Sequence, residues 1–241
     1  GKRHWPRHRQ DASAYWSTLT GVMTVTAEQV IAGQAVYTKG TLRAYDFVVL
    51  VVSNQFIWQC PSLRIEEHYN RHVTAIHLDV GVGTVSFLDR CQFPSRAPRV
   101  ALMDINQRVL EHASRRIAKY KPETYRRNVL EPISIDAKKF DSVGINYLLH
   151  CIPGSIESKA VALDHLKALM NGDAVLFGST LLQGGVSRNW AAKRLMSTYN
   201  KKGIFSNQHD DLDCLKRALS QRFGDVLVEV VGCAAIFSGR A

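Results

Sequence analysis

Residues 74–88 read TAIHLDVGVGTVSFL, and this stretch decides the fold. A short apolar run ends at Asp79, and Gly81 and Gly83 follow before a segment that is compatible with a helix. A strand, a glycine-spaced turn and a helix in this order are typical of nucleotide-binding α/β domains. Glycine suits the turn because a ligand at the carboxyl end of the strand must contact backbone, which a side chain would block.

A second unit of the same kind follows at residues 99–104, which read RVALMD. Asp104 closes this apolar run about 20 residues after the glycines, the spacing at which an acid meets ribose hydroxyls. A carboxylate accepts hydrogen bonds from both hydroxyls of a ribose, and it disfavours a 2′-phosphate. The pattern therefore predicts an unphosphorylated ribonucleoside as part of the ligand.

Strand and helix patterns alternate along the rest of the chain, which predicts an α/β fold: a Rossmann-like, doubly wound, mostly parallel sheet. Further strands are expected at residues 124–129, 140–149 and 174–182, and helices at residues 62–69, 106–120, 156–170, 187–199 and 211–223. Residues 226–231 and 234–238 lie so close in sequence that they must form an antiparallel hairpin at the C-terminus. Residues 23–70 are expected to form an N-terminal helical cap on a Rossmann-like core at residues 71–241.

Four segments resemble, in this order, the class I S-adenosylmethionine-dependent methyltransferases of the small-molecule type. They are HLDVGVGT (77–84), ALMDIN (101–106), RRNVLEPI (126–133) and FDSVGINYLLHCIP (140–153). The resemblance covers the chain from Tyr69 to the C-terminus. It implies S-adenosyl-L-methionine as the cofactor and S-adenosyl-L-homocysteine as the product.

The resemblance also implies a cofactor site. Its expected members are Asp79, Gly81, Val82, Gly83, Thr84, Asp104, Ile105, Asn128, Val129 and Asn146. The residues around the glycines would line the methionine moiety, Asp104 would hold the ribose, and Asn128 with Val129 would flank the adenine. An ordinary turn role for Asn128 is an equally open alternative. The family commonly has a third glycine where this chain has Val85, which predicts a displaced helix or a narrower methionine pocket.

Methyl transfer is an in-line displacement, so an enzyme mainly holds donor and acceptor in line. Tyr147 and His150, at the end of the fourth strand, are the candidate catalytic residues. His150 would act as the base, because the ordinary histidine pKa of about 6.5 allows proton uptake near neutral pH; a loop histidine bonded to backbone is the alternative. Tyr37 and Tyr45 are the candidate acceptor-binding residues, with plain core packing as their alternative.

Three other functions share parts of this pattern. A nicotinamide-dependent oxidoreductase would need the fuller motif G-x-G-x-x-G, but Ser86 stands where its third glycine would be. In addition, the negative charge of Asp79, just before the glycines, would repel a pyrophosphate. An RNA-modifying methyltransferase would suit the net charge of +10, but residues 146–149 read NYLL rather than Asn-Pro-Pro-Tyr. A relative that binds the cofactor without methylating is the third. The preferred reading is O- or C-methylation of a small, partly apolar metabolite, plausible in secondary metabolism.

Composition sets the remaining limits. A chain of 241 residues with 46% hydrophobic residues has room for one domain with a real core. Its five cysteines include no C-x-x-C pair, which predicts reduced thiols, no metal site and a cytoplasmic location. No membrane span is expected. Residues 1–22 are polar and basic and are interpreted as a leader or a non-native remnant, with an ordinary native basic arm as an equally open alternative. A small-molecule acceptor is the expected partner, nucleic acid is not, and a homodimer is left open.

Overall fold

The computed structural model describes residues 53–241. The predicted basic leader at residues 1–22 and most of the predicted helical cap lie outside the described residues, and so do Tyr37 and Tyr45. The following elements and contacts all belong to the described part of the chain.

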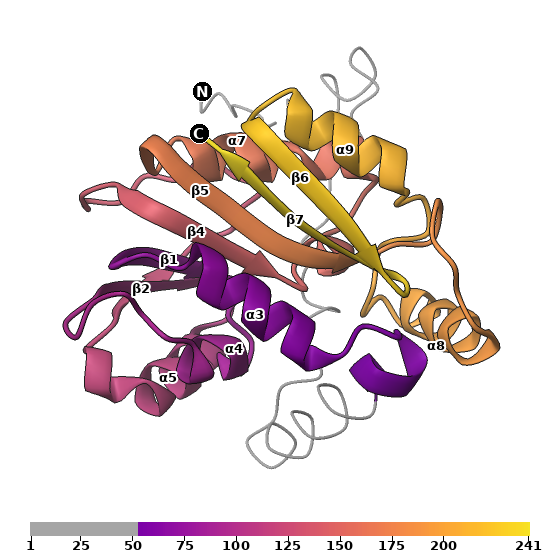
Figure 1. Ribbon diagram of the computed structural model, residues 1–241, viewed down its shortest axis with the longest axis horizontal. Helices are drawn as coiled ribbons and strands as arrows, with labels where there is room; N and C mark the ends of the chain where they lie inside the picture. The colour runs from indigo at the N-terminus through magenta and orange to yellow at the C-terminus, as the bar shows by residue number, and fades with distance from the viewer. Residues whose placement is uncertain (1–52) are drawn as a thin grey trace, which may run out of the picture.

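One mixed sheet forms the centre of the molecule, with strand order β3-β2-β1-β4-β5-β7-β6 (Figure 1). Neighbours from β3 to β5 pair in parallel, and β7 runs antiparallel between β5 and β6. The predicted parallel sheet and C-terminal hairpin are therefore confirmed. The strands are β1 (Ile76–Val80), β2 (Arg99–Asp104), β3 (Glu123–Arg126), β4 (Phe140–Asn146), β5 (Met170–Leu181), β6 (Gly224–Val231) and β7 (Ala234–Arg240).

Helices cover both faces of this sheet. They are α3 (Ser62–His72), α4 (Ser86–Arg90), α5 (Gln107–Arg116), α6 (Ile156–Lys159), α7 (Val161–Lys167), α8 (Trp190–Lys201) and α9 (Leu212–Ser220), with 3-10 turns η2 (Ala118–Tyr120) and η3 (Leu149–Cys151). In Figure 1, α3 crosses the near face of the sheet and α7 lies behind β5.

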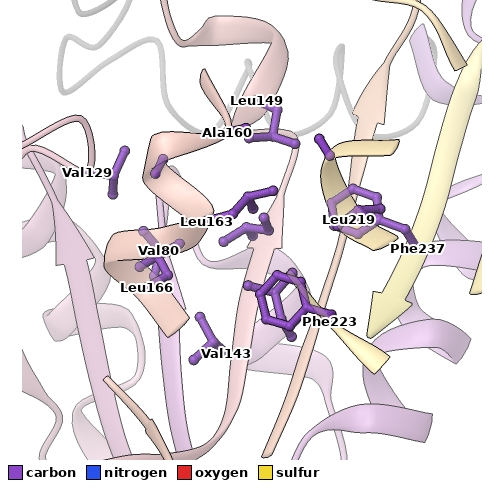
Figure 2. Packing of buried hydrophobic residues seen from close by; sticks show 14 of the residues in the cluster. Val80, Val129, Val143, Leu149, Ala160, Leu163, Leu166, Leu219, Phe223 and Phe237 are labelled. Atoms are coloured by element: carbon purple, nitrogen blue, oxygen red, sulfur yellow. The ribbon is translucent and has the colours of Figure 1, made fainter. Parts of the chain in front are cut away.

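Alternation along β2 shows why helices are needed on both faces. Ala101 and Met103 pack into one hydrophobic cluster, whereas Val100 and Leu102 pack into another, because successive side chains of a strand point to opposite faces. The first cluster joins the sheet to α7 and α9, and Figure 2 shows Leu163 among its members. The second joins the sheet to α3, α4 and α5. A strand buried on both faces reads as a continuous apolar run, as the sequence of β2 does.

Several predicted boundaries are wrong, and each has a local cause. β4 ends at Asn146 rather than residue 149, because Tyr147 adopts a left-handed backbone with φ 55°. The helix predicted at residues 156–170 is two shorter helices, α6 and α7. It cannot reach residue 170, because Met170 pairs with Phe140 and so begins β5.

Side chains cap two of these helices at their N-termini. The Asn106 side chain accepts a hydrogen bond from the Arg108 amide at 3.0 Å, and Asp211 accepts one from the Cys214 amide at 2.7 Å. Both are the N-caps that Asn and Asp favour. Ser62, by contrast, is the first residue of α3, and Pro61 holds its N-cap position without a side-chain bond.

Two observations about membrane-spanning helices and metal-ligating clusters apply to the described residues alone. None of their helices is both long and apolar enough to cross a membrane. They also contain no group of three or more side chains that would ligate a metal ion. All five cysteines are free thiols.

Candidate active site

The carboxyl ends of β1, β2 and β4 bring the predicted polar residues to one edge of the sheet. Asp79 of β1 stands opposite Gly144 of β4, and Asp104 and Asn146 are the last residues of β2 and β4. The strand order reverses between β1 and β4. Ligands of open α/β sheets bind outside the carboxyl ends of the strands at such a reversal.

The two glycines after β1 have different reasons to be glycine. Both have positive φ, 66° at Gly81 and 50° at Gly83. A Cβ at Gly81 would come within 2.6 Å of Leu148 Cδ1, so this glycine makes room for a side chain of the protein. A Cβ at Gly83 would meet nothing within 4 Å. Gly83 therefore presents bare backbone to open space, as a ligand requires.

Asp104 fastens the glycine turn to β2. Its carboxylate accepts hydrogen bonds from the backbone amides of Asn106, Ile105, Val82 and Gly83, with the Asn106 bond at 2.8 Å. Burial raises the pKa of Asp104 to about 6, and these amide donors oppose that rise. The turn and the second acid thus form one unit before any ligand arrives.

Asp79 is more deeply enclosed than Asp104. It is 6% exposed, and burial raises its pKa to about 7. A hydrogen bond from Tyr69 lowers this pKa and the negative charge of Asp104 raises it. Within the described residues no cation pairs with Asp79. A buried carboxylate without a counterion is costly, and a cationic ligand group would relieve that cost.

Val85, which stands where the family commonly has a third glycine, caps α4 in the left-handed conformation with φ 52°. A β-branched residue is strained there. Its side chain is 3% exposed and packs with Val82 and Leu88 in the cluster beneath α3, α4 and α5. The valine keeps the conformation that glycine would adopt and buries its side chain in the core.

Arg116 holds the far end of the glycine turn. Its guanidinium donates to the Thr84 carbonyl at 3.1 Å and to the Asp89 carboxylate at 3.0 Å. The Arg116 side chain is partly buried, at 27% exposure, as these contacts require. The α5 helix, through Arg116, fixes the position of Thr84.

Asn146 and Tyr147 come next to one another where β4 meets the site. The Asn146 Oδ1 accepts from Ser179 Oγ at 3.1 Å, and its Nδ2 is buried without a hydrogen-bond partner among the described residues. The Tyr147 hydroxyl donates to Asn54 Oδ1 at 3.1 Å. Burial raises the pKa of Tyr147 well above its ordinary value. Tyr147 is thus a neutral phenol, and Asn146 Nδ2 is a donor without a partner among the described residues.

His150 does not match the expected base. Its side chain is buried, and burial together with the charge of Lys159 lowers its pKa to about 3. The Leu181 amide donates to His150 Nδ1 at 3.3 Å, so the ring proton resides on Nε2. A histidine whose free lone pair already accepts from backbone is the alternative that the sequence left open. The assignment of His150 as a base with an ordinary pKa is therefore corrected.

Asn128 makes the bonds of a turn asparagine. Its Oδ1 accepts from the Leu130 amide at 3.1 Å, and its Nδ2 donates to Glu131 at 2.8 Å. The Val129 side chain packs in the core, and its carbonyl is 2.9 Å from His165 Nδ1. The third strand ends before these residues, at Arg126. Their predicted contact with adenine stays a prediction.

Aromatic rings form a continuous series around Tyr147, just after the end of β4. Ring centroids are 6.5 Å apart for Phe87 and Tyr147, 5.6 Å for Tyr147 and His150, and 4.6 Å for His150 and Phe205. Trp58 lies a further 6.1 Å from Phe205. The surroundings of Tyr147 are thus largely apolar.

Comparison with known proteins identifies the family of this chain. Residues 78–176 match the methyltransferase domain family. The demethylluteothin O-methyltransferase of Streptomyces thioluteus is 39% identical over 210 residues, which cover 87% of this chain and 91% of that protein. The physcion biosynthesis cluster O-methyltransferase of Aspergillus chevalieri is 32% identical over 207 residues, 85% of this chain and 93% of that one.

This chain belongs to the class I S-adenosylmethionine-dependent methyltransferases. Among solved structures, the DhpI–SAH complex shares the fold, with a TM-score of 0.59 and 14% identity over 90% of this chain and 98% of that chain. The protein is a small-molecule methyltransferase, and the oxidoreductase alternative is not retained.

The residues at this edge fit the cofactor that the methyltransferase family implies. Gly83 faces open space, Asp79 is a buried acid without a counterion among the described residues, and Asn146 Nδ2 is an unpartnered donor. A zwitterionic methionine group carries both an ammonium for the acid and a carboxylate for the donor. The donor set therefore suits S-adenosylmethionine.

Two features of this methyltransferase were missed by sequence reasoning. Tyr69 hydrogen-bonds Asp79, and it lies on a helix that precedes every recognised motif. Lys159 forms a buried ion pair with Asp210 at 2.6 Å, across many intervening residues. Neither pairing has a short-range signal, because each joins side chains that only the folded sheet brings together.

Proposed function

We propose that this methyltransferase transfers a methyl group from S-adenosylmethionine to the oxygen of a small, partly apolar molecule that carries an acidic hydroxyl. Both relatives described above are named O-methyltransferases, which supports oxygen as the acceptor atom. The name of the Aspergillus protein also refers to a biosynthesis cluster, which supports secondary metabolism. The ring series around Tyr147 supports an acceptor with an apolar part.

The observation that carries the acidic hydroxyl is the state of His150. Its Nδ1 accepts from the Leu181 amide, and burial lowers its pKa to about 3. A histidine in this state takes up a proton poorly near neutral pH. An enol or phenol that is already ionised needs no base, and the Nε2–H of His150 remains a hydrogen-bond donor.

In the proposed complex the chain binds and orients. Asp79 accepts hydrogen bonds from the ammonium of the methionine moiety, and Asn146 Nδ2 donates to its carboxylate. Gly83 lets the backbone approach, and Asp104 accepts from the ribose hydroxyls. The cofactor supplies an electrophilic methyl group on a sulfonium. Holding that methyl in line with the acceptor oxygen supplies most of the rate enhancement.

Calorimetric titration of the full chain with S-adenosylhomocysteine and with NAD tests the cofactor. Binding of S-adenosylhomocysteine alone is expected, and binding of NAD alone would reject the proposal. Transfer of a labelled methyl group to matched acceptors, an acidic phenol, an aliphatic alcohol and an aromatic amine, tests the acceptor class. The acidic phenol should be the preferred substrate, and equal transfer to the amine would rule out the oxygen assignment.

The His150→Asn variant tests the role of the ring. Asparagine Oδ1 can replace Nδ1 as the acceptor of the Leu181 amide, while the Nε2–H donor is lost. Turnover of an acidic phenol should fall at every pH by a similar factor. A loss confined to pH values above the histidine pKa, with disappearance of the acid limb of the profile, would restore His150 as the base.

A further inference from the structure

Tyr69 occupies an unusual place for a polar group. Its side chain is 1% exposed and belongs to the apolar cluster beneath α3. Its hydroxyl lies 2.9 Å from His77 Nε2, and it is near enough to the Asp79 carboxyl to lower the pKa of that acid by hydrogen bonding. Phe177 packs edge-on against the same ring, with centroids 5.0 Å apart. A buried hydroxyl held between an acid and an imidazole has little freedom to turn.

The polar contacts continue from His77 across the sheet. His77 is fully buried in β1 and stands opposite Ser142 of β4. Its Nδ1 lies 2.8 Å from Ser142 Oγ, which in turn accepts from the Thr74 amide at 3.0 Å. Gly144, two residues along β4, leaves space for this row, because a Cβ there would come within 3.1 Å of Asp79 Oδ1 and 3.2 Å of His77 Cε1.

Hydrogen-bond chemistry gives this row a direction. Ionised Asp79 can only accept, so the Tyr69 hydroxyl must donate to it. The Tyr69 oxygen then accepts from His77 Nε2–H. Burial lowers the pKa of His77 to about 3, so the ring is neutral; in the tautomer with the proton on Nε2, its Nδ1 accepts from the Ser142 hydroxyl. The Thr74 amide donates to Ser142 Oγ, and every donor in the row points toward the acid.

We propose that Tyr69, His77 and Ser142 are positioning residues that keep Asp79 ionised and aimed at the ammonium of the cofactor. The proposal rests on the proposed function, because it gives Asp79 that ligand. None of the three residues touches the cofactor in this scheme; they act through Asp79. A hydrogen bond donated to a buried carboxylate is charge-assisted and is stronger than a neutral one.

The surroundings of Asp79 explain why such support is needed. The titratable groups that face it are Tyr69 of α3, His77 of β1, Asp104 of β2 and Cys91 after α4. Asp104 repels a second negative charge, and burial raises the pKa of the Cys91 thiol to about 12, so it stays neutral. Among these groups, Tyr69 is the one that lowers the pKa of Asp79 by a hydrogen bond.

Two ligands separate a positioning role from a structural one. S-adenosylhomocysteine carries the ammonium, and 5′-methylthioadenosine has the same nucleoside without the amino acid part. Tyr69→Phe should weaken S-adenosylhomocysteine by about 10- to 100-fold, the range for a hydrogen bond to a charged group. Binding of 5′-methylthioadenosine should be unchanged. Tyr120→Phe, on the turn after α5, is the matched control and should change neither affinity.

The pH dependence provides the second readout. Asp79 must be ionised to bind an ammonium, so the affinity of the wild-type chain for S-adenosylhomocysteine should fall as pH drops below about 7. Without the Tyr69 donor the pKa of Asp79 is higher, and in Tyr69→Phe the fall should begin at a higher pH. Ser142→Ala, at the far end of the row, should give a smaller shift in the same direction.

The possible outcomes are distinct. Equal losses for both ligands, or an unshifted pH profile with unchanged affinity, would overturn the positioning role while leaving the cofactor assignment intact. Failure of the wild-type chain to bind S-adenosylhomocysteine would instead reject the proposed function. Loss confined to S-adenosylhomocysteine with a shifted profile supports the proposal.

Discussion

Two buried acids, Asp79 of β1 and Asp210 in the segment before α9, solve the same physical problem differently. Asp79 is 6% exposed and Asp210 is 0% exposed. Burial raises their pKa values to about 7 and about 6. Asp210 has Lys159 at 2.6 Å, whereas Asp79 has a neutral tyrosine and no cation among the described residues.

This difference separates a structural acid, Asp210, from a ligand-binding acid, Asp79. Lys159 also donates to the Ser206 carbonyl at 2.5 Å, so the ion pair ties α6 to the segment before α9. The charge of Asp210 is compensated within the fold. That of Asp79 is compensated only when a ligand brings a cation, which is the central claim for this site.

The largest effect is expected from breaking the compensated pair. Lys159→Met leaves Asp210 buried without its cation, and loss of one partner of a buried pair costs about 3–5 kcal/mol. The free energy of unfolding in urea at neutral pH measures this loss. Lys201→Met, at the exposed end of α8, is the control and should stay within about 0.5 kcal/mol of wild type.

The double variant Lys159→Met with Asp210→Leu should recover most of that loss, because no charge is then left buried. A single variant as stable as wild type would show that the pair is not structural. Saturating S-adenosylhomocysteine should stabilise Lys159→Met no more than it stabilises wild type, because the ammonium of the ligand pairs with Asp79 and not with Asp210.

A smaller effect is expected when the uncompensated acid is removed. The pKa of Asp79 is about 7 in the folded chain against an ordinary 3.8. The folded state therefore binds this proton more tightly, and the free energy of unfolding falls as pH rises through that interval. Asp79→Asn removes this fall, so the variant should gain about 1–3 kcal/mol relative to wild type between about pH 5 and about pH 7.5.

Urea unfolding of both proteins across this pH range checks the gain. Parallel curves for wild type and Asp79→Asn would mean that the acid already finds a counterion in the free protein. Such a result would remove the distinction between the two acids.

Much of this edge could be predicted from sequence, and the reasons are local. The runs before Asp79 and Asp104 are apolar and end in an acid, and Asn106 and Asp211 follow the rules for N-caps. These signals lie within a few residues of the features that they predict. They place both acids and the glycine turn at the correct strand ends.

The rest depends on contacts that sequence spacing does not encode. His77 reads as an ordinary strand residue until Tyr69 and Ser142 meet it, and Lys159 reads as a surface lysine until Asp210 reaches it. His150 was expected to have an ordinary histidine pKa, but its ring packs against Phe205, and burial with the charge of Lys159 lowers that pKa. Burial of polar groups is a tertiary property, so their roles were the part that sequence reasoning missed.

The smallest effect is expected on ligand affinity when the structural acid, Asp210, is changed. Asp210→Asn should leave the affinity for S-adenosylhomocysteine within about twofold of wild type, a change of about 0.4 kcal/mol. Asp79→Asn should lower that affinity by about 10- to 100-fold. Calorimetric titration of both variants compares them directly, and similar losses in the two would show that the acids do not differ in function.

Proton release on binding tests the central claim most directly. At about pH 6, most Asp79 is protonated in the free chain, since its pKa is about 7. Calorimetric titration in buffers of different ionisation enthalpy should show about one more proton released with S-adenosylhomocysteine than with 5′-methylthioadenosine, and no such difference in Asp79→Asn. Equal proton release for the two ligands in the wild-type chain would contradict the assignment of Asp79 as an acid that awaits the ligand's cation.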